Sequence, residues 1–514
     1  MASDIVRLTG MNSGLDTEAI IGAYTSTHSK RVDDAKKKLT LNKWTQDAWK
    51  DMNSKIYGFY SKTLSTLRFS TAYKKQKTTT SNGALSVVAG NGAVNGTQTA
   101  KIKSTAAAAY LTGAEVAVGS GSDNLSEKLG IEEGKQITYS DGKGNNKTIQ
   151  IGGSSEDGNV TVVNTMDELM SAFKSAGINA NFDAANKRIF LSAKETGASN
   201  DFNLSGDNET LAKLGLASSA QIASLGDGTG YTAASKQDGT SAVLELNGAE
   251  FKSDTNSFTI NGSTYQINYM PADANETISI NTQNDYDGIY DTVKGILKEY
   301  NALMKDISSA YNAGSAKGYD PLTEEQKDAM TDKEVEEWEK KIKDSLLRRD
   351  ENLGNVMNAL TTSFTQGFQI GGSTMYLSDF GISTLGYFST EENERYGLHI
   401  DGDISDENTA AKEDKLKAMI ASDPEKVANF FSAFANKLYD DIYSKMGTSK
   451  LSSIYKVYND KQLKSEQTDW EKKVSDLESK LKAIEDKYYK KFAAMETLMS
   501  SINSTQNYMT SFFG

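Results

Sequence analysis

The sequence predicts a multidomain α+β protein in which terminal helices form a coiled coil and a β-rich head is inserted into a helical stem. Three observations predict this fold: a long heptad stripe at the C-terminus, a second helical tract at the N-terminus, and β-rich sequence confined to the middle of the chain. At 514 residues the chain is too long for one core. The usual domain size of about 100–200 residues suggests three or four domains.

The C-terminal stripe alternates steps of four and three residues from Leu463 to Phe512, and no Pro or Gly interrupts it before Gly514. Twelve of its fifteen positions are apolar, which is typical of a coiled-coil seam. Such a stripe is too narrow for a globular core, so the helix needs a partner. We expect the apolar positions to form an assembly interface: Leu463, Trp470, Val474, Leu477, Leu481, Ile484, Tyr488, Met495, Leu498, Ile502, Met509 and Phe512.

The expected partner is a helix over residues 17–77, with Asp16 as its N-cap and Glu18 in its first turn. We therefore expect the two chain ends to pair, while residues 1–15 are expected to be disordered in isolation. The seam of this helix is weaker, because its register loosens around His28 and Asn42. Its apolar members are Ile21, Tyr24, Val32, Ala35, Leu39, Trp49, Met52, Ile56, Phe59, Tyr60, Leu64 and Leu67.

The middle of the chain has the texture of strands. Short β-branched runs between Gly and Asn turns begin near residues 78–83, and residues 111–227 indicate a compact α+β unit. A capping box at Thr165 predicts a short helix to about Ala176. Hairpins are expected around Asp141-Gly142, Asp183 to Asn186, Asn247-Gly248 and Asn261-Gly262.

Helices return after Pro271. Apolar spacing predicts one helix over 286–311, and capping boxes at Thr323 and Thr331 predict short helices before a longer one over 346–364. Residues 376–389 and 396–402 favour a pair of hairpin strands, and Asp423-Pro424 is typical of a helix start.

Composition excludes several classes of protein. The chain has no cysteine, which excludes disulfides and thiolate metal sites, and its net charge of −13 argues against nucleic acid as a partner. No apolar run approaches the ~18 residues of a membrane span, so no membrane partner is expected. The N-terminus lacks the layout of a cleavable signal peptide, so a secreted form must use another route.

The sequence offers no catalytic constellation, cofactor site or metal site. The chain has only two histidines, His28 and His399, and no arrangement around them resembles a zinc site or a catalytic triad. Residues 130–136 imitate a phosphate loop but are one residue short and lack the Ser or Thr that binds magnesium. Residues 401–412 begin like a calcium loop, yet Asp406 stands where the turn needs Gly and Lys412 where a bidentate Glu is needed. No enzyme activity is expected.

Several motifs, in their order along the chain, resemble those of the flagellar filament-capping family, hook-associated protein 2. The N-terminal signature of that family resembles Ser13, Gly14, Leu15 and Asp16, which precede the long helix. Residues 492–512 resemble its C-terminal signature, residues 298–307 its stem helix, and residues 377–402 with 423–431 a pattern shared by flagellar axial proteins. The resemblance covers nearly the whole chain.

The resemblance implies a secreted structural protein of the bacterial flagellum, located outside the cell at the filament tip. It implies export through the flagellar type III export apparatus with an export chaperone, self-assembly into a ring homo-oligomer, a pentamer, and help to flagellin as it folds and inserts. The seam residues then become the interface between subunits or with the filament. No enzyme activity and no cofactor are implied.

The domains expected from the resemblance are each discontinuous except the last. They are a terminal coiled-coil domain (1–42 plus 465–514), a helical stem domain (43–77 plus 283–464), a β-rich head domain (78–115 plus 228–282) and a second α+β head domain (116–227). An acidic insert at residues 321–344 departs from the family pattern and has no assigned role.

Two alternatives stay open at this point. Another axial protein of the same assembly, a hook–filament junction protein or flagellin, shares part of the motif order, although the opening and closing signatures favour the cap. A surface adhesin is an alternative from a different class. Location at filament tips or along the cell wall distinguishes these alternatives.

Overall fold

The computed structural model describes residues 13–513 except 91, 228 and 387–393, and the chain forms two compact units. Residues 1–74 and 286–514 make up the helical unit, and residues 75–285 make up the β-rich unit. The expected α+β class is confirmed, since long helices occur together with several small, mostly antiparallel sheets. The disorder expected for residues 1–15 falls largely outside the described residues.

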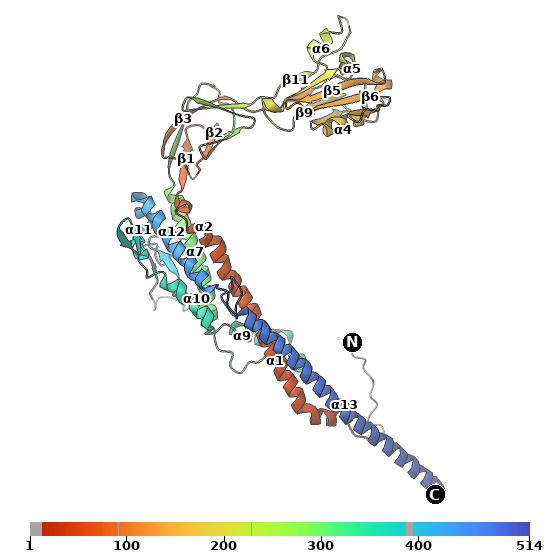
Figure 1. Ribbon diagram of the computed structural model, residues 1–514, viewed down its shortest axis with the longest axis vertical. Coiled ribbons are helices and arrows are strands. Elements are labelled where there is room, and N and C mark those ends of the chain that lie inside the picture. Colours follow the sequence, from red (N-terminus) through yellow and green to blue (C-terminus); the bar gives the residue numbers. More distant parts are fainter. Residues whose placement is uncertain (1–12, 91, 228, 387–393, 514) are drawn as a thin grey trace. The chain divides into compact units, whose positions relative to one another are not determined.

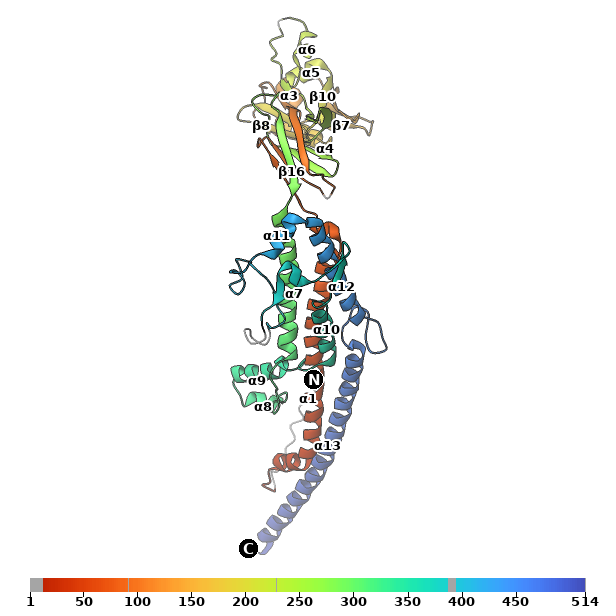
Figure 2. The same ribbon diagram turned by 90° about the vertical axis from the view of Figure 1, so that its left-hand side faces the viewer.

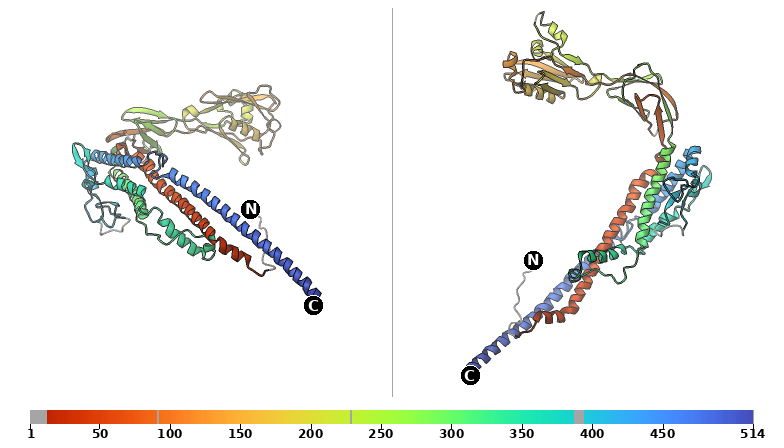
Figure 3. Two further views of the ribbon diagram at one scale, coloured as in Figure 1. Left: turned by 60° about the horizontal axis from the view of Figure 1, so that its bottom comes forward. Right: turned by 180° about the vertical axis from the view of Figure 1, so that it is seen from behind.

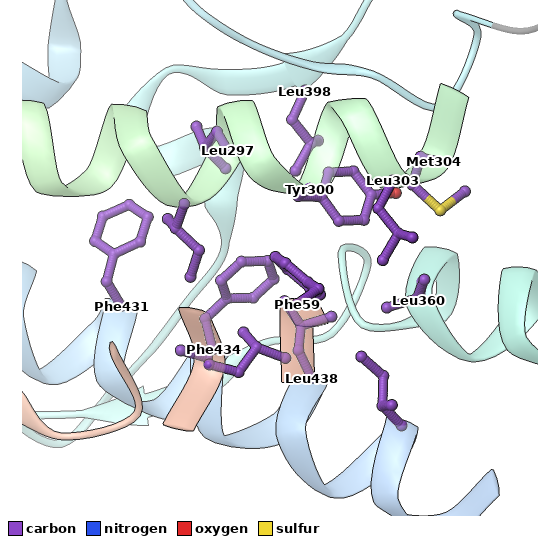
Figure 4. Close-up of a cluster of buried hydrophobic side chains, with 14 of the residues drawn as sticks. Phe59, Leu297, Tyr300, Leu303, Met304, Leu360, Leu398, Phe431, Phe434 and Leu438 are labelled. Atoms are coloured by element: carbon purple, nitrogen blue, oxygen red, sulfur yellow. The ribbon is translucent and has the colours of Figure 1, made fainter. Parts of the chain in front are cut away.

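The helical unit has one continuous apolar core (Figure 4). Phe59, Tyr300, Leu360 and Phe434 meet there from four different elements, and Tyr300 packs edge-on against Phe364 at 4.6 Å between ring centroids. The helices that supply this core are α1 (Thr17–Gly58), α7 (Tyr286–Tyr311), α10 (Glu351–Thr362), α11 (Lys415–Ser422) and α12 (Pro424–Lys445), and α13 (Asp460–Phe513) follows them.

The first helix is shorter than the sequence indicates. A helix over 17–77 was expected. In the structure, α1 is followed without a break by a π-helical turn, η1 (Phe59–Leu64), and by α2 (Ser65–Leu67). The helical run then stops at the extended Phe69, before the 3₁₀ turn η2 (Ser70–Tyr73). Strand β1 (Gln76–Thr80) already begins at Gln76. The prediction was wrong here because a β-branched run with a cross-strand partner outweighs the helix propensity of the lysines before it.

The segment after α7 combines short helices and hairpins. The capping boxes at Thr323 and Thr331 are confirmed and open α8 (Glu324–Asp328) and α9 (Asp332–Asp344). The helix expected over 346–364 begins only at Glu351, since Asp350 caps α10. Residues Leu377–Phe380, which were expected to be part of a strand, form a 3₁₀ turn, η4. The strands of this region are β17 (Phe368–Ile370), β18 (Ser373–Met375), β19 (Ile382–Thr384) and β20 (Leu398–Ile400). β17 pairs with β18, and β19 with β20.

One part of the β-rich unit is a five-stranded sheet, β1-β16-β3-β12-β13, which shares an apolar core with a three-stranded sheet, β14-β15-β2. Asn247-Gly248 and Asn261-Gly262 turn its hairpins as expected, and both asparagines have positive φ, as a type I′ turn requires. The remaining strands are β2 (Leu85–Val88), β3 (Gly96–Ser104), β12 (Ala242–Leu246), β13 (Ala249–Ser253), β14 (Ser257–Ile260), β15 (Ser263–Ile267) and β16 (Ile278–Asn284).

A second core lies between two four-stranded sheets, β10-β5-β6-β7 and β11-β4-β9-β8. Its apolar residues come from those sheets and from α4, which opens with the expected capping box at Thr165. The strands are β4 (Tyr110–Thr112), β5 (Lys135–Asp141), β6 (Asn146–Ile151), β7 (Val160–Val163), β8 (Asn179–Asp183), β9 (Arg188–Ser192), β10 (Phe202–Gly206) and β11 (Ser235–Gln237). The helices are α3 (Leu125–Leu129), α4 (Met166–Ser175), α5 (Asn208–Lys213), α6 (Ser219–Ala223) and the turn η3 (Ala198–Asn200).

The hairpins expected around Asp141 and Asp183 are both present. The sheet of the second head domain extends beyond the expected limits of 116 and 227. Strands β4 and β11 lie outside those limits and pair with each other, and β4 also pairs with β9, which lies inside them. Strands of three residues carry too little periodicity for the sequence to reveal them.

Candidate functional site

The candidate assembly surface is built by α1 and α13, which run antiparallel beside each other (Figures 1 and 2). The pairing extends from Ser13 beside Glu496 to the rings of Tyr24 and Tyr488, stacked at 5.2 Å, and on to Gln46 beside Gln467. The two ends of the described chain therefore pair, as the heptad pattern indicated.

The stripe of α1 does not lose its register. Positions separated by alternating steps of four and three residues face inward along the whole helix, and each is buried or half-buried. Polar members of the stripe hide this pattern in the sequence, because a search for apolar residues passes over them. The inward positions are Ile21, Thr25, His28, Val32, Ala35, Leu39, Asn42, Gln46, Trp49, Asn53 and Ile56.

A polar layer fixes the alignment of the two helices. The amide of Gln46 donates to Asn42 Oδ1 at 2.6 Å and to Gln467 Oε1 at 3.1 Å, and Asn42 Nδ2 donates to Glu466 at 3.4 Å. Buried polar groups that satisfy one another in only one alignment specify the register of a helix pair. Asn42, the polar residue at which the predicted seam loosens, therefore helps to determine the register of the α1–α13 pair.

Charged side chains flank the seam. Lys36 pairs with Glu478 at 2.7 Å and Lys43 with Glu471 at 3.4 Å, and these side chains are about half exposed, so each ion pair adds little stability. A hydrogen bond from Gln467, followed by the pairing with Lys43, holds the pKa of Glu471 below its usual range. The ammonium group of Lys38 lies 5.2 Å from the centre of the Trp470 ring.

The N-terminal signature forms the start of this helix pair. Ser13 donates from its backbone N–H to Glu496 at 3.3 Å and also from its hydroxyl group. Gly14 has φ +67°, a left-handed conformation that favours glycine, and Asp16 Oδ1 accepts from Ala19 N at 3.0 Å as the N-cap. Leu15 is exposed. The signature therefore joins the first turn of α1 to α13, and Glu496 is a member of the site that the sequence did not reveal.

The predicted seam residues of α13 fall into two groups. Those that lie against α1 or the start of the core are buried or half-buried: Leu463, Trp470, Val474, Leu477, Leu481, Ile484, Tyr488 and Met495. Beyond Glu496, α13 continues past the first residue of α1 (Figure 3), and Leu498, Ile502 and Met509 are 64, 61 and 55% exposed. The side chain of Phe512 lies outside the described residues. A role of any of these residues between subunits stays a prediction.

Other titratable groups do not assemble into a catalytic or metal centre in the described part of the chain, where no cluster of three or more His, Asp or Glu side chains could hold a metal ion. In the imitation calcium loop, Asp401 accepts from Lys412 and Asp403 from Lys294, each at 2.8 Å. His399 Nδ1 pairs with Asp406. Within the described residues, no helix is long and apolar enough to cross a membrane.

A helical unit that pairs both ends of the chain, with a β-rich unit inserted between its segments in sequence, defines a multidomain protein with a terminal helix pair. Two sequence families specify it further. Residues 239–504 match the family described as flagellar hook-associated protein 2 C-terminus, and residues 13–109 match its N-terminus. The chain belongs to the flagellar hook-associated protein 2 family.

Individual proteins similar to this chain carry the same family name. The chain is 23% identical over 559 residues to flagellar hook-associated protein 2 of Halalkalibacterium halodurans, across 99% of this chain and 100% of that protein. It is 25% identical over 351 residues to the Thermotoga maritima protein of the same name, across 65% of this chain and 49% of that protein. The crystal structure of the D1-D2-D3 domains of the flagellar cap protein from Escherichia coli matches 82% of this chain and 99% of that chain with a TM-score of 0.51. Its 15% identity makes this a similarity of fold.

Proposed function

We propose that the chain forms the cap at the distal end of the bacterial flagellar filament, outside the cell, where it promotes the folding and insertion of flagellin. Membership of the flagellar hook-associated protein 2 family carries this proposal, because the family match covers both terminal regions. The chain acts in this proposal by assembly and not by catalysis.

The terminal helices supply the contact with the filament. α13 extends past α1 with Leu498, Ile502 and Met509 exposed on the same stripe that α1 covers further along the helix. An apolar stripe on a protruding helix is stabilised when another helix covers it. In the cap, that covering helix belongs to a neighbouring subunit or to the filament.

Self-assembly into a ring, here a pentamer, and export with a chaperone through the flagellar type III apparatus complete the proposal. Passage through such a channel requires an unfolded chain, and this chain has no cysteine that could form a disulfide. The α1–α13 pair closes only after both chain ends have emerged, so the assembly surface forms at the site of use.

A deletion strain tests this function. Cells without the chain should release monomeric flagellin into the medium and carry no full-length filaments, and a copy of the gene supplied on a plasmid should restore both properties. Full-length filaments in the deletion strain would contradict a cap function, and would favour an adhesin if attachment to surfaces were lost instead.

A further inference from the structure

An exposed aromatic patch lies where α1, α12 and the loop before α13 meet. Tyr57 of α1, Tyr443 of α12 and Tyr455 of the loop are 36, 51 and 40% exposed, and the loop adds Leu451 and Ile454. We call these five residues the tyrosine patch. Beneath it, Tyr60 stacks on Tyr439 at 4.3 Å and links the rings of Tyr57 and Tyr443. Rigid, exposed tyrosines above a packed layer are typical of a protein interface.

The loop is held in a costly conformation. Tyr455 has φ +62°, a left-handed conformation that is rare for an aromatic residue and strains the backbone. The buried Asn53 of α1 maintains it, since its Nδ2 donates to Tyr455 O at 3.3 Å and its Oδ1 accepts from Val457 N at 3.0 Å. Strain of this kind persists where a side chain must be presented in one direction, and here it presents the Tyr455 ring beside Tyr57 at 5.5 Å.

The surroundings of the patch are basic in an acidic protein. Residues 440–464, which include Tyr443 and the whole loop, contain five lysines and three carboxylates, Asp440, Asp441 and Asp460, whereas the whole chain carries a net charge of −13. Asp460 is already engaged, because its Oδ1 accepts from Ser453 N at 2.7 Å. The partner of the patch is therefore expected to be acidic.

The acidic insert at residues 321–344 has the complementary charge. Its stretch 324–337 contains seven carboxylates and two lysines, and all seven carboxylate residues are exposed on α8 and α9. The insert is folded and fixed to the helical unit: Ile342 is buried, Trp338 packs against Tyr319 at 4.5 Å, and Lys343 lies over the ring of Trp44 at 4.6 Å. An acidic surface therefore lies on the same helical unit as the tyrosine patch.

The two surfaces lie on opposite sides of α1. Figure 2 shows α8 and α9 on one side of this helix and the loop between α12 and α13 on the other. Two different, complementary surfaces on opposite sides of one subunit make a heterologous contact, and repetition of such a contact around an axis closes a ring.

We propose that the acidic insert of one copy docks on the tyrosine patch of the next copy. This proposal rests on the self-assembly proposed above and adds the surfaces that carry it. The patch supplies aromatic contact area, the lysines beside it (Lys445, Lys450 and Lys456) steer the insert, and the insert supplies the carboxylates.

Cross-linking in the full chain tests the contact, and the absence of native cysteine makes the labelling clean. Copies with Glu336→Cys are mixed with copies with Lys450→Cys and treated with a short bis-maleimide. Covalent dimers are expected from the mixture and not from either variant alone. Lys298→Cys, on the exposed side of α7, replaces Lys450→Cys in the matched control and should give no dimer with Glu336→Cys.

Charge exchange provides the second arm. Changing Glu325, Glu336 and Glu337 to Lys should weaken self-association on the order of ten-fold in sedimentation velocity, with a loss of its salt dependence. Combining this variant with Lys445, Lys450 and Lys456 changed to Glu should restore association. As the control, the same charge change is made in the β-rich unit, at Glu127, Glu132 and Glu133.

The outcomes separate the two proposals. Rings that form without the Glu336–Lys450 cross-link, or charge variants no weaker than the control, overturn the docking contact and leave the cap function standing. A chain that never self-associates contradicts both the docking and the ring.

Discussion

Asn53 shows how one buried side chain can determine the course of the chain far away in sequence. Its amide makes one hydrogen bond to each of two loop residues, Tyr455 and Val457, and it is 4% exposed. Truncation of this side chain leaves a buried N–H and a strained carbonyl without partners, and such a loss costs about 1–3 kcal/mol.

We therefore expect Asn53→Ala to lower the free energy of unfolding of the helical unit by about 1–3 kcal/mol in urea denaturation. Asn436→Ala, on the exposed face of α12, is the matched control and should change stability by less than about 0.5 kcal/mol. Equal stability of the two variants would show that Asn53 does not hold the loop.

Asp254 joins the two parts of the β-rich unit. Its Oδ1 accepts from Ser241 Oγ at 2.7 Å, its Oδ2 accepts from the hydroxyl of Ser199, and its backbone carbonyl accepts from Thr196. The hydrogen bond from Ser199, followed by that from Ser241, lowers the pKa of Asp254 below its usual value.

A lowered pKa in the folded state means that this carboxylate contributes stability above its ordinary pKa of about 3.9, and loses that contribution as the pH falls through the folded pKa. NMR titration should therefore show Asp254 ionising below the ordinary value. In the double variant Ser199→Ala and Ser241→Ala its pKa should rise toward that value. A pKa that is the same in both proteins would contradict this role of the two hydroxyl groups.

At the scale of elements, the α1–α13 pair is the feature on which assembly depends. Leu477, Leu481 and Ile484 are half-buried in this pair. Changing all three to Asp should separate the helices, because each substitution places a charge without a partner in the seam.

In this triple variant, circular dichroism should show less helix with an unchanged strand signal, and cells should leak flagellin. Ser475, Ser479 and Lys482 lie on the exposed side of the same helix and are changed to Asp in the matched control, which should retain the helix. Full-length filaments in the seam variant would show that the pair is not the coupling element.

The end of α13 should be the most easily cleaved part of the described helices. Leu498, Tyr508 and Met509 are exposed on the part of α13 that extends past α1, and a helix outside a packed core is marginal in water. Limited chymotrypsin treatment of the free subunit should cut at Leu498 and Tyr508 before Trp470. Cleavage at Trp470 at the same rate would contradict this order of stability.

Elements with strong local signals could be predicted from the sequence, and those decided by tertiary contacts could not. The Asn-Gly hairpins, the capping boxes and the unbroken stripe of α13 were all visible in the sequence. The helix expected to reach residue 77 ends early because strand β1 finds its partner in β16, more than 190 residues away. Asn42 and Gln46 of the α1 stripe were not recognised as seam members because their partners Glu466 and Gln467 lie on α13.

For the whole molecule, separate cores mean that the β-rich unit should keep its packing when the seam between α1 and α13 is altered. The apolar core of the helical unit and the two cores of the β-rich unit share no residue. The candidate site was only half predictable for a related reason. The α13 stripe is continuous in sequence, whereas the tyrosine patch joins Tyr57 of α1 to α12 and the loop after it, hundreds of residues further along the chain.

The position of the chain on the cell tests the central claim most directly. Immunogold electron microscopy of intact cells, with an antibody against the β-rich unit, measures where the protein lies. A cap predicts gold at the distal tips of filaments and none along their length. Label along the filament would indicate flagellin, label at the base a junction protein, and label on the cell wall an adhesin, and each of these results would contradict the cap.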